Sequence, residues 1–202
     1  MPHASFDELA ALILSRPPRL GPVRLVAVDG PSGAGKTVFA DRLSRRLNAP
    51  VVHTDDLLDG WGDQFTFWGR LEETVLVPLR AGRPAQYQRY LWHERRFGGE
   101  PVRTEPADVV VLEGVSSARR VIRPELSLSA FVTAPRRLRW TRVIGRDGTT
   151  DVAFPAYLER WRTAEDRHFA AEGTAGYADV GVDGAADGSD DGYEQLWRRP
   201  PG

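Results

Sequence analysis

The stretch DGPSGAGKT, residues 29–37, decides the fold. It matches the pattern G-x-x-x-x-G-K-[ST], in which glycines let backbone N–H groups turn toward anionic oxygens. An apolar, β-branched run at 23–28 precedes it and predicts a buried parallel strand. The segment 36–48 follows it and places apolar residues on one face of a helix. A strand, a glycine-rich loop and a helix in this order predict a phosphate-binding loop, the P-loop.

We expect this loop to hold the phosphates of ATP. Lys36 is expected to reach the β- and γ-phosphates, and the Thr37 hydroxyl to ligate Mg²⁺. Lys36 is the single lysine of the chain, and a planar arginine cannot replace its compact ammonium in so tight a loop. The candidate nucleotide-binding residues are Gly30, Pro31, Ser32, Gly33, Ala34, Gly35, Lys36, Thr37 and Val38.

The composition is that of a soluble globular protein, with 41% hydrophobic and 27% charged residues. A net charge of −1 gives no general attraction to nucleic acid or to an anionic membrane. The chain has no cysteine, which excludes a disulfide scaffold, a thiolate zinc site and a cysteine nucleophile. Ser5 and Glu8 favour the start of a helix rather than a signal peptide, and no apolar run reaches membrane-spanning length. We therefore expect a cytoplasmic protein that binds neither nucleic acid nor membranes, while its oligomeric state stays open.

Strands and helices are predicted to alternate along the chain. Further strands are expected at 50–53, 108–114, 128–133 and 178–184, with helices at 69–82, 135–147 and 155–173. This order predicts an α/β fold of three layers, with a mostly parallel five-stranded sheet and a small lid. We expect one P-loop kinase-like domain over 1–184, with a helical extension at 1–20 and a flexible acidic tail and C-terminal segment at 185–202.

Carboxylates lie at the carboxyl ends of two predicted strands, at the edge of the sheet where ligands bind. Asp55 is a candidate catalytic base for an acceptor hydroxyl and a candidate Mg²⁺ ligand, although it could instead cap the following helix. Asp56 and Asp59 are alternatives for the same roles. Glu113 is expected to orient Mg²⁺ together with Thr37, unless it is a solvated strand end.

Arginines and aromatic residues supply the remaining candidates. Arg142 and Arg146 share a helix face with Arg139, so they either clamp the transferred phosphoryl group from the lid or form a solvated face. The aromatic side chains of 61–70 and 87–97 either form the wall of a planar substrate's pocket or belong to the core.

With these residues in place, the chain from about 23 to 184 resembles the uridine kinase family of P-loop nucleoside kinases. The matching segments are VAVDGPSGAGKT, HTDDLL, GRPAQYQRY, DVVVLEG, RVIGRD and ADVGVDG. The resemblance implies a P-loop kinase fold and transfer of a phosphoryl group from ATP to the 5′-hydroxyl of a nucleoside. It makes Asp55 the catalytic base. The acceptor pocket that it implies contains Asp55, Tyr87, Tyr90, Trp92 and Arg95.

The chain departs from the family in this acceptor pocket. The family's Tyr-Asp pair is Tyr90-Leu91 here, and Arg95 stands where the family has histidine. Leu57 and Leu58 replace its Phe-Tyr. A pocket that loses polar partners loses discrimination between acceptors.

Other classes remain as alternatives. The predicted ATP-binding part of the site is equally compatible with a kinase of another hydroxylated metabolite, such as a sugar, a pantothenate-like acid or an antibiotic. A nucleotide-binding regulatory protein without an acceptor is the alternative from a different class. A switch GTPase is disfavoured because no Asn-Lys-x-Asp segment is present.

Overall fold

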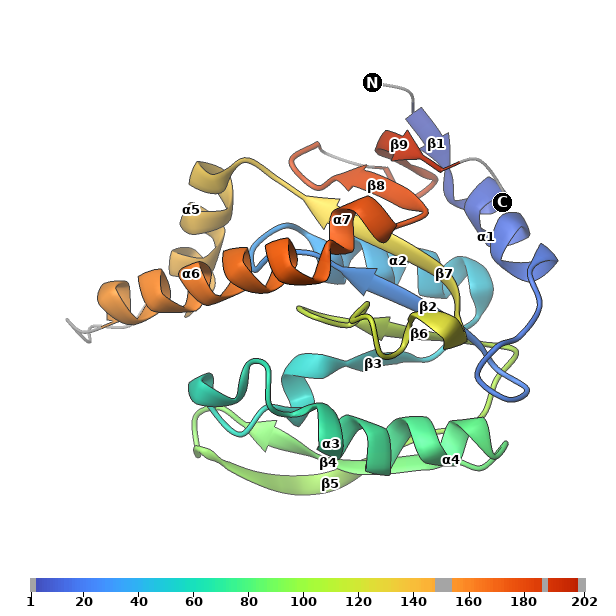
Figure 1. The fold of residues 1–202 in the computed structure, drawn as a ribbon, viewed down its shortest axis with the longest axis horizontal. Helices are drawn as coiled ribbons and strands as arrows, with labels where there is room; N and C mark the ends of the chain where they lie inside the picture. Colours follow the sequence, from blue (N-terminus) through green and yellow to red (C-terminus); the bar gives the residue numbers. More distant parts are fainter. Residues whose placement is uncertain (1–2, 148–153, 187–188, 200–202) are drawn as a thin grey trace.

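The computed structural model of the protein describes residues 3–147, 154–186 and 189–199. Within these residues a central sheet has seven strands in the order β1-β9-β8-β7-β2-β6-β3 (Figure 1). The strands are β1 (His3–Ser5), β2 (Arg24–Asp29), β3 (Val51–His53), β6 (Val109–Glu113), β7 (Leu126–Thr133), β8 (Val180–Asp183) and β9 (Gly192–Arg198). The strands from β3 to β8 pair in parallel, whereas β9 pairs antiparallel with β8 and β1.

The helices lie close to the predicted positions. They are α1 (Phe6–Ser15), α2 (Lys36–Leu47), α3 (Trp68–Leu71), α4 (Val77–Arg80), α5 (Arg136–Asp147), α6 (Phe154–Glu172) and α7 (Thr174–Tyr177). A π-helical turn (Glu72–Leu76) joins α3 to α4, so the helix predicted at 69–82 is continuous from 68 to 80. Short 3₁₀ helices cover Thr54–Leu57, Trp61–Asp63 and Arg123–Glu125. The strands β4 (Ala85–Leu91) and β5 (Arg96–Thr104) form a separate antiparallel hairpin.

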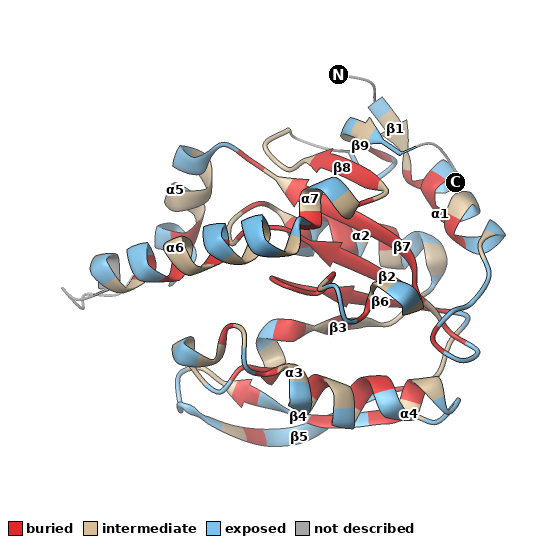
Figure 2. Ribbon diagram, in the orientation of Figure 1, coloured by how far each residue is buried: buried red, intermediate tan, exposed pale blue. Residues whose placement is uncertain are grey.

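Alternation along the strands divides the core into two halves. Leu25 and Leu112 face the side that carries α3, α4 and Trp161 of α6. Val26 and Val111 face the side that carries α1 and α2. Burying each such side chain stabilises the fold by about 1.5–3 kcal/mol. The buried strands therefore lie between helices on both faces, and the expected three-layer α/β fold is confirmed (Figure 2).

The number of strands was predicted wrongly: the sheet has seven strands, not five. All five expected parallel strands are present, and β1 and β9 extend the sheet at one edge. Their pairing joins the two ends of the chain, which a search for local patterns does not detect. The helix expected within 1–20 is α1, and its N-cap Ser5 accepts a hydrogen bond from the Asp7 N–H. It buries Phe6 in the core.

Within the acidic tail and C-terminal segment expected at 185–202, residues 192–198 form β9. The ring of Tyr193 packs 5.2 Å from those of Phe6 and Phe39. Asp191 pairs with Arg46 of α2, so one of the acidic residues that suggested a mobile tail is bound to a basic helix. Burial of Tyr193 and this ion pair attach β9 and the residue before it to the domain.

No helix in the described part of the chain is long and apolar enough to cross a membrane.

Candidate functional site

The predicted phosphate loop joins β2 to α2 at the carboxyl edge of the parallel strands. Gly35 caps α2 with φ of +98°, a left-handed conformation that glycine adopts without strain. The first turn of α2 thus presents its N–H groups toward the loop, where an anion is favoured. The Lys36 side chain is only 8% exposed, and its Nζ lies 3.3 Å from the Pro31 carbonyl oxygen. The single lysine of the chain is therefore held inside the loop.

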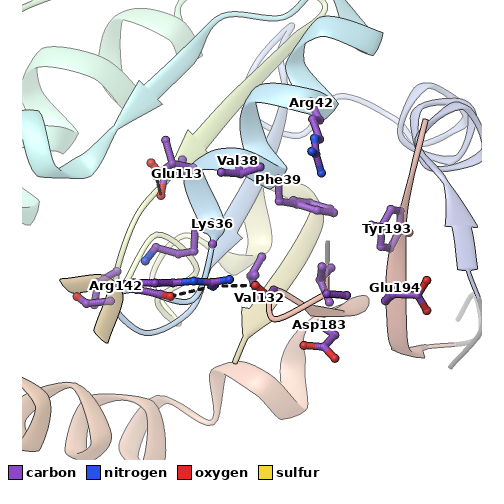
Figure 3. A pocket seen from close by; sticks show the side chains of 18 of the residues that line it. Lys36, Val38, Phe39, Arg42, Glu113, Val132, Arg142, Asp183, Tyr193 and Glu194 are labelled. Carbon is purple, nitrogen blue, oxygen red and sulfur yellow. Dashed lines mark hydrogen bonds between the residues drawn. The ribbon is translucent and has the colours of Figure 1, made fainter. Parts of the chain in front are cut away.

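A cavity of about 790 Å³ opens over this loop. Figure 3 shows Lys36, Glu113 and Arg142 on one side of it, and Arg42 and Tyr193 on the other. Of the nine residues predicted to bind the nucleotide, six line the cavity: Ser32, Gly33, Gly35, Lys36, Thr37 and Val38. The other three, Gly30, Pro31 and Ala34, are buried at the back of the loop. The volume suits a ligand of nucleotide size.

Glu113 lies beside Thr37 at one corner of this cavity. It ends β6 and is 5% exposed, so the alternative of a solvated strand end is wrong. Its Oε1 is 3.4 Å from the Thr37 Oγ1, which donates to it. Its Oε2 is 2.7 Å from Nδ1 of His53, the last residue of β3.

Burial acts to raise the pKa of Glu113, but the His53 hydrogen bond and the charges of Lys36 and His53 outweigh it and lower that pKa. The same hydrogen bond raises the pKa of His53. Our sequence interpretation missed His53, although its place at the end of the strand beside β6 is a signal that could have found it.

These side chains fit a Mg²⁺ ion that is shared with phosphate oxygens. The described residues contain no group of three or more His, Asp or Glu side chains arranged for a metal. Mg²⁺ bound with a nucleotide needs only one or two protein ligands, because waters and phosphates complete its octahedron. The Thr37 hydroxyl and the ionised Glu113 carboxylate supply oxygen donors of that kind.

Asp55 lies where this cavity meets a second one. It belongs to the 3₁₀ helix Thr54–Leu57, whose N-cap is His53, so the structure does not place Asp55 as a helix cap. The residue is exposed, and it lines both cavities, whose walls displace part of the water around its side chain. This desolvation raises its pKa, with Glu113 adding to the rise and Lys36 and Arg146 opposing it. Water in the open cavities moderates the effect.

The alternative aspartates make contacts away from the two cavities. Asp56 lies 3.4 Å from the Arg89 guanidinium on β4. The Asp59 N–H donates to Asp63, 2.8 Å away. Neither aspartate lines one of the two cavities.

The arginines of α5 separate into different roles. Arg142 donates to the carbonyl oxygens of Gly33 (3.3 Å) and Gly184 (2.8 Å), and so joins the loop to the residue after β8. Arg146 lines both cavities. Arg139 instead donates to the Ala134 carbonyl oxygen before its own helix.

Glu165 of α6 is a second residue that the sequence interpretation missed. It is 1% exposed, and Oε1 accepts from the Ser32 N–H (3.1 Å). The Ser32 hydroxyl also donates to it, as does the Trp161 Nε1, 2.8 Å away. One buried carboxylate therefore fixes both a loop residue and an indole ring. No local signal distinguishes it from the other charges of this helix.

The second cavity, of about 450 Å³, lies on the other side of Asp55. It shares four residues with the first cavity: Ser32, Asp55, Val143 and Arg146. Its remaining lining residues are Leu58, Trp61, Trp92, His93, Leu158 and Trp161. Asp55 and Arg146 therefore border both cavities.

Of the residues that the resemblance assigned to the acceptor, the structure brings only Asp55 and Trp92 into this cavity. Tyr87 faces the core of the domain and is 4% exposed, and burial raises its pKa. Tyr90 is buried against Trp92 and Phe97. Arg95 is exposed in the hairpin turn, with a positive φ of 54°.

No family model matches the sequence. Two curated proteins of Arabidopsis thaliana, inorganic pyrophosphatases TTM1 and TTM2, are 29% and 31% identical to the chain over 119 residues. The match covers 54% of this chain but only 18% of either relative.

Solved structures match over almost the whole fold. A protein from Bacillus stearothermophilus named as a possible uridine kinase has a TM-score of 0.65 at 21% identity, with 87% of this chain and 96% of that chain covered. A candidate fructose transport system kinase from Silicibacter sp. has a TM-score of 0.59 at 19% identity, with 84% and 95% covered. The resemblance seen in the sequence is thus confirmed at the level of the fold, which is that of the P-loop kinases.

Proposed function

We propose that the protein is an ATP-dependent phosphotransferase that moves the γ-phosphoryl group to a hydroxyl of a small molecule. The observation that carries this proposal is the position of Asp55, which lines both cavities. Lys36 and Thr37 line the larger cavity on the side of the loop, and the smaller cavity offers room for an acceptor. A hydrolase has no need of a second substrate cavity beside the phosphate loop.

In the proposed reaction, the bond between the γ-phosphorus and the β–γ bridging oxygen breaks, and its electron pair leaves with ADP. The acceptor oxygen forms the new bond to phosphorus, and its proton passes to the Asp55 carboxylate. The raised pKa of Asp55 makes it a better proton acceptor than an ordinary aspartate, provided that it is ionised.

Other residues neutralise and position the phosphates. The Lys36 ammonium and the N-terminus of α2 oppose the charge of the β- and γ-phosphates. Arg146 lines both cavities and is the candidate to contact the phosphoryl group during its transfer. Arg142 joins the loop to the residue after β8. Mg²⁺, held by Thr37 and Glu113 with Asp55 nearby, would supply further neutralisation of phosphate charge.

The family resemblance makes a nucleoside such as uridine or cytidine the first acceptor to consider. Kinases of other hydroxylated metabolites are compatible with the same ATP-binding residues and remain alternatives. A regulatory protein would bind ATP and transfer nothing, and the names of the Arabidopsis relatives add pyrophosphate hydrolysis to the reactions worth testing.

The test is transfer of label from γ-labelled ATP to a panel of nucleosides, sugars and simple alcohols. We expect a labelled phosphate ester with at least one acceptor, and none with Lys36→Ala. Label found only as inorganic phosphate, or hydrolysis of pyrophosphate without any ester, would overturn the proposal. ATP binding without transfer to any acceptor would favour the regulatory alternative.

A further inference from the structure

The second cavity is lined mainly by large apolar side chains. Three tryptophans contribute to it, together with Leu58 and Leu158. Its polar and charged lining residues are Ser32, Asp55, His93 and Arg146. Three of these, Ser32, Asp55 and Arg146, also line the cavity over the loop, so this polarity lies at the reacting end. The body of a bound acceptor would therefore contact mainly apolar surface.

The tryptophans form a continuous wall, with Trp61 between the other two. The ring centroid of Trp61 lies 4.8 Å from that of Trp92 and 5.4 Å from that of Trp161. Rings at these separations are in direct contact, so no ligand group fits between them. The plane of Trp61 is tilted by 58° from that of Trp92 and is nearly perpendicular, at 86°, to that of Trp161. A flat body can therefore stack on one indole face and meet a neighbouring ring at its edge, and the touching rings leave no cage for a quaternary ammonium group.

The indole N–H of Trp161 is already used within the protein. The Trp161 Nε1 donates to Glu165 at 2.8 Å and lies 3.1 Å from the Ser32 Oγ. The Ser32 hydroxyl in turn donates to Glu165. These hydrogen bonds hold the Trp161 indole in place before any ligand arrives. This part of the wall is therefore preformed.

We infer, on the basis of the proposed function, that the acceptor is an aromatic alcohol: a hydroxyl on a short arm attached to a flat apolar ring system. The hydroxyl would lie at Asp55, and the ring would stack on one indole face of the wall formed by Trp61, Trp92 and Trp161. The volume of about 450 Å³ accommodates one or two fused rings. In the transfer step the hydroxyl loses its proton to Asp55 and gains the phosphoryl group, while ADP leaves.

The experiment compares tryptophol and phenylethanol with uridine, cytidine, fructose and choline, each with γ-labelled ATP and Mg²⁺. The expected result is a labelled ester of an aromatic alcohol, with kcat/KM at least roughly tenfold above that of any comparator. Titration of the same compounds in the presence of a non-hydrolysable ATP analogue measures binding without turnover.

A pair of variants tests the wall itself. Trp92→Ala should raise KM for the aromatic alcohol roughly tenfold, because it removes one stacking surface. Trp140→Leu, a half-buried tryptophan on α5 outside the cavity, should leave KM unchanged.

Four outcomes overturn the inference: preference for a nucleoside, sugar or choline, binding of aromatic alcohols without transfer, failure to bind them, and an unchanged KM in Trp92→Ala. In each case the proposed function stands as long as another compound of the wider panel receives phosphate. The proposed function fails separately, if no compound of the wider panel receives phosphate.

Discussion

His53 and Glu113 end neighbouring parallel strands in register, and their side chains meet with His53 Nδ1 2.7 Å from Glu113 Oε2. The pairing lowers the pKa of the carboxyl and raises that of the imidazole. Both shifts favour the charged pair. A carboxylate is thereby kept ionised in a buried position beside the phosphate loop.

The first prediction concerns the pH range in which this pair stabilises the fold. The Glu113 contribution is present above its ordinary pKa of 4.5 and is lost as pH falls through its lowered value. The His53 contribution is present below 6.5 and is lost as pH rises through its raised value. His53→Ala should therefore destabilise most between about pH 4.5 and 6.5. Urea unfolding across pH 4–9 measures this, with exposed His93→Ala as control, and a pH-independent loss would contradict it.

The sequence predicted what local patterns encode. Loop, flanking strand and helix are contiguous, so the phosphate site could be recognised without knowledge of the fold. The lowered pKa of Glu113 was not predictable, because it depends on His53, which is sixty positions away in sequence. Glu165 reaches Ser32 from 133 positions away, through the placement of α6.

The acceptor side was harder for another reason. Ala85 and Tyr87 alternate with polar residues, a pattern that predicts a half-buried strand with Tyr87 inward. Our interpretation followed the family resemblance instead and placed Tyr87 at the substrate. The strand pattern gives the better account of this tyrosine.

The second prediction tests the attachment of β9. A Cβ added to Gly181 of β8 would lie 2.2 Å from ring atoms of Trp197 on β9. Gly181→Ala must displace that ring and should destabilise the protein by about 1–3 kcal/mol. Gly176→Ala is the control, since nothing lies within 4 Å of its added Cβ. Equal unfolding free energies for the two variants would show that Trp197 does not pack on β8.

The third prediction concerns Asp29, which is fully buried and accepts hydrogen bonds from the N–H groups of Gly30, Ser116 and Ala118. Burial raises its pKa to about 6 from an ordinary 3.8. The folded protein therefore holds this proton more tightly than the unfolded chain does. The stability that this contributes is full below pH 3.8 and is lost as pH rises through about 6.

The difference between those pKa values corresponds to about 3 kcal/mol. The unfolding free energy of wild type minus that of Asp29→Asn should fall by up to this amount between pH 4 and pH 7. The exposed Asp41→Asn on α2 serves as control and should show no such slope. A flat difference for Asp29→Asn would contradict burial as the dominant effect.

The fourth prediction concerns Lys36. Lys36→Ala removes the ammonium that opposes the phosphate charge, and Lys36→Arg replaces it with a guanidinium fork that does not fit the position of a compact charge. Both variants should therefore lower phosphoryl transfer by about 10²–10³-fold. Circular dichroism should show an intact fold. Arg45→Ala on the exposed side of α2 is the control and should keep full activity. Activity of Lys36→Arg within a few-fold of wild type would exclude the proposed role of the loop lysine.

The last prediction concerns Asp55 as the proton acceptor. Asp55→Asn keeps the shape of the side chain and removes its charge, so ATP affinity should change little while turnover falls roughly 10²-fold or more. The neighbouring Asp56→Asn provides the matched control, because Asp56 faces Arg89 and lines neither cavity.

The pH profile gives an independent check of the same role. A base must be ionised, so activity should decline as pH falls through the pKa of Asp55, which lies above its ordinary 3.8. Asp55→Asn should lose this acidic limb, and Asp56→Asn should keep it. If Asp55→Asn instead loses ATP affinity together with turnover, Asp55 acts at the nucleotide and its metal rather than at the acceptor hydroxyl. If it keeps both, another group takes the proton, and the place of Asp55 between the two cavities has no part in catalysis.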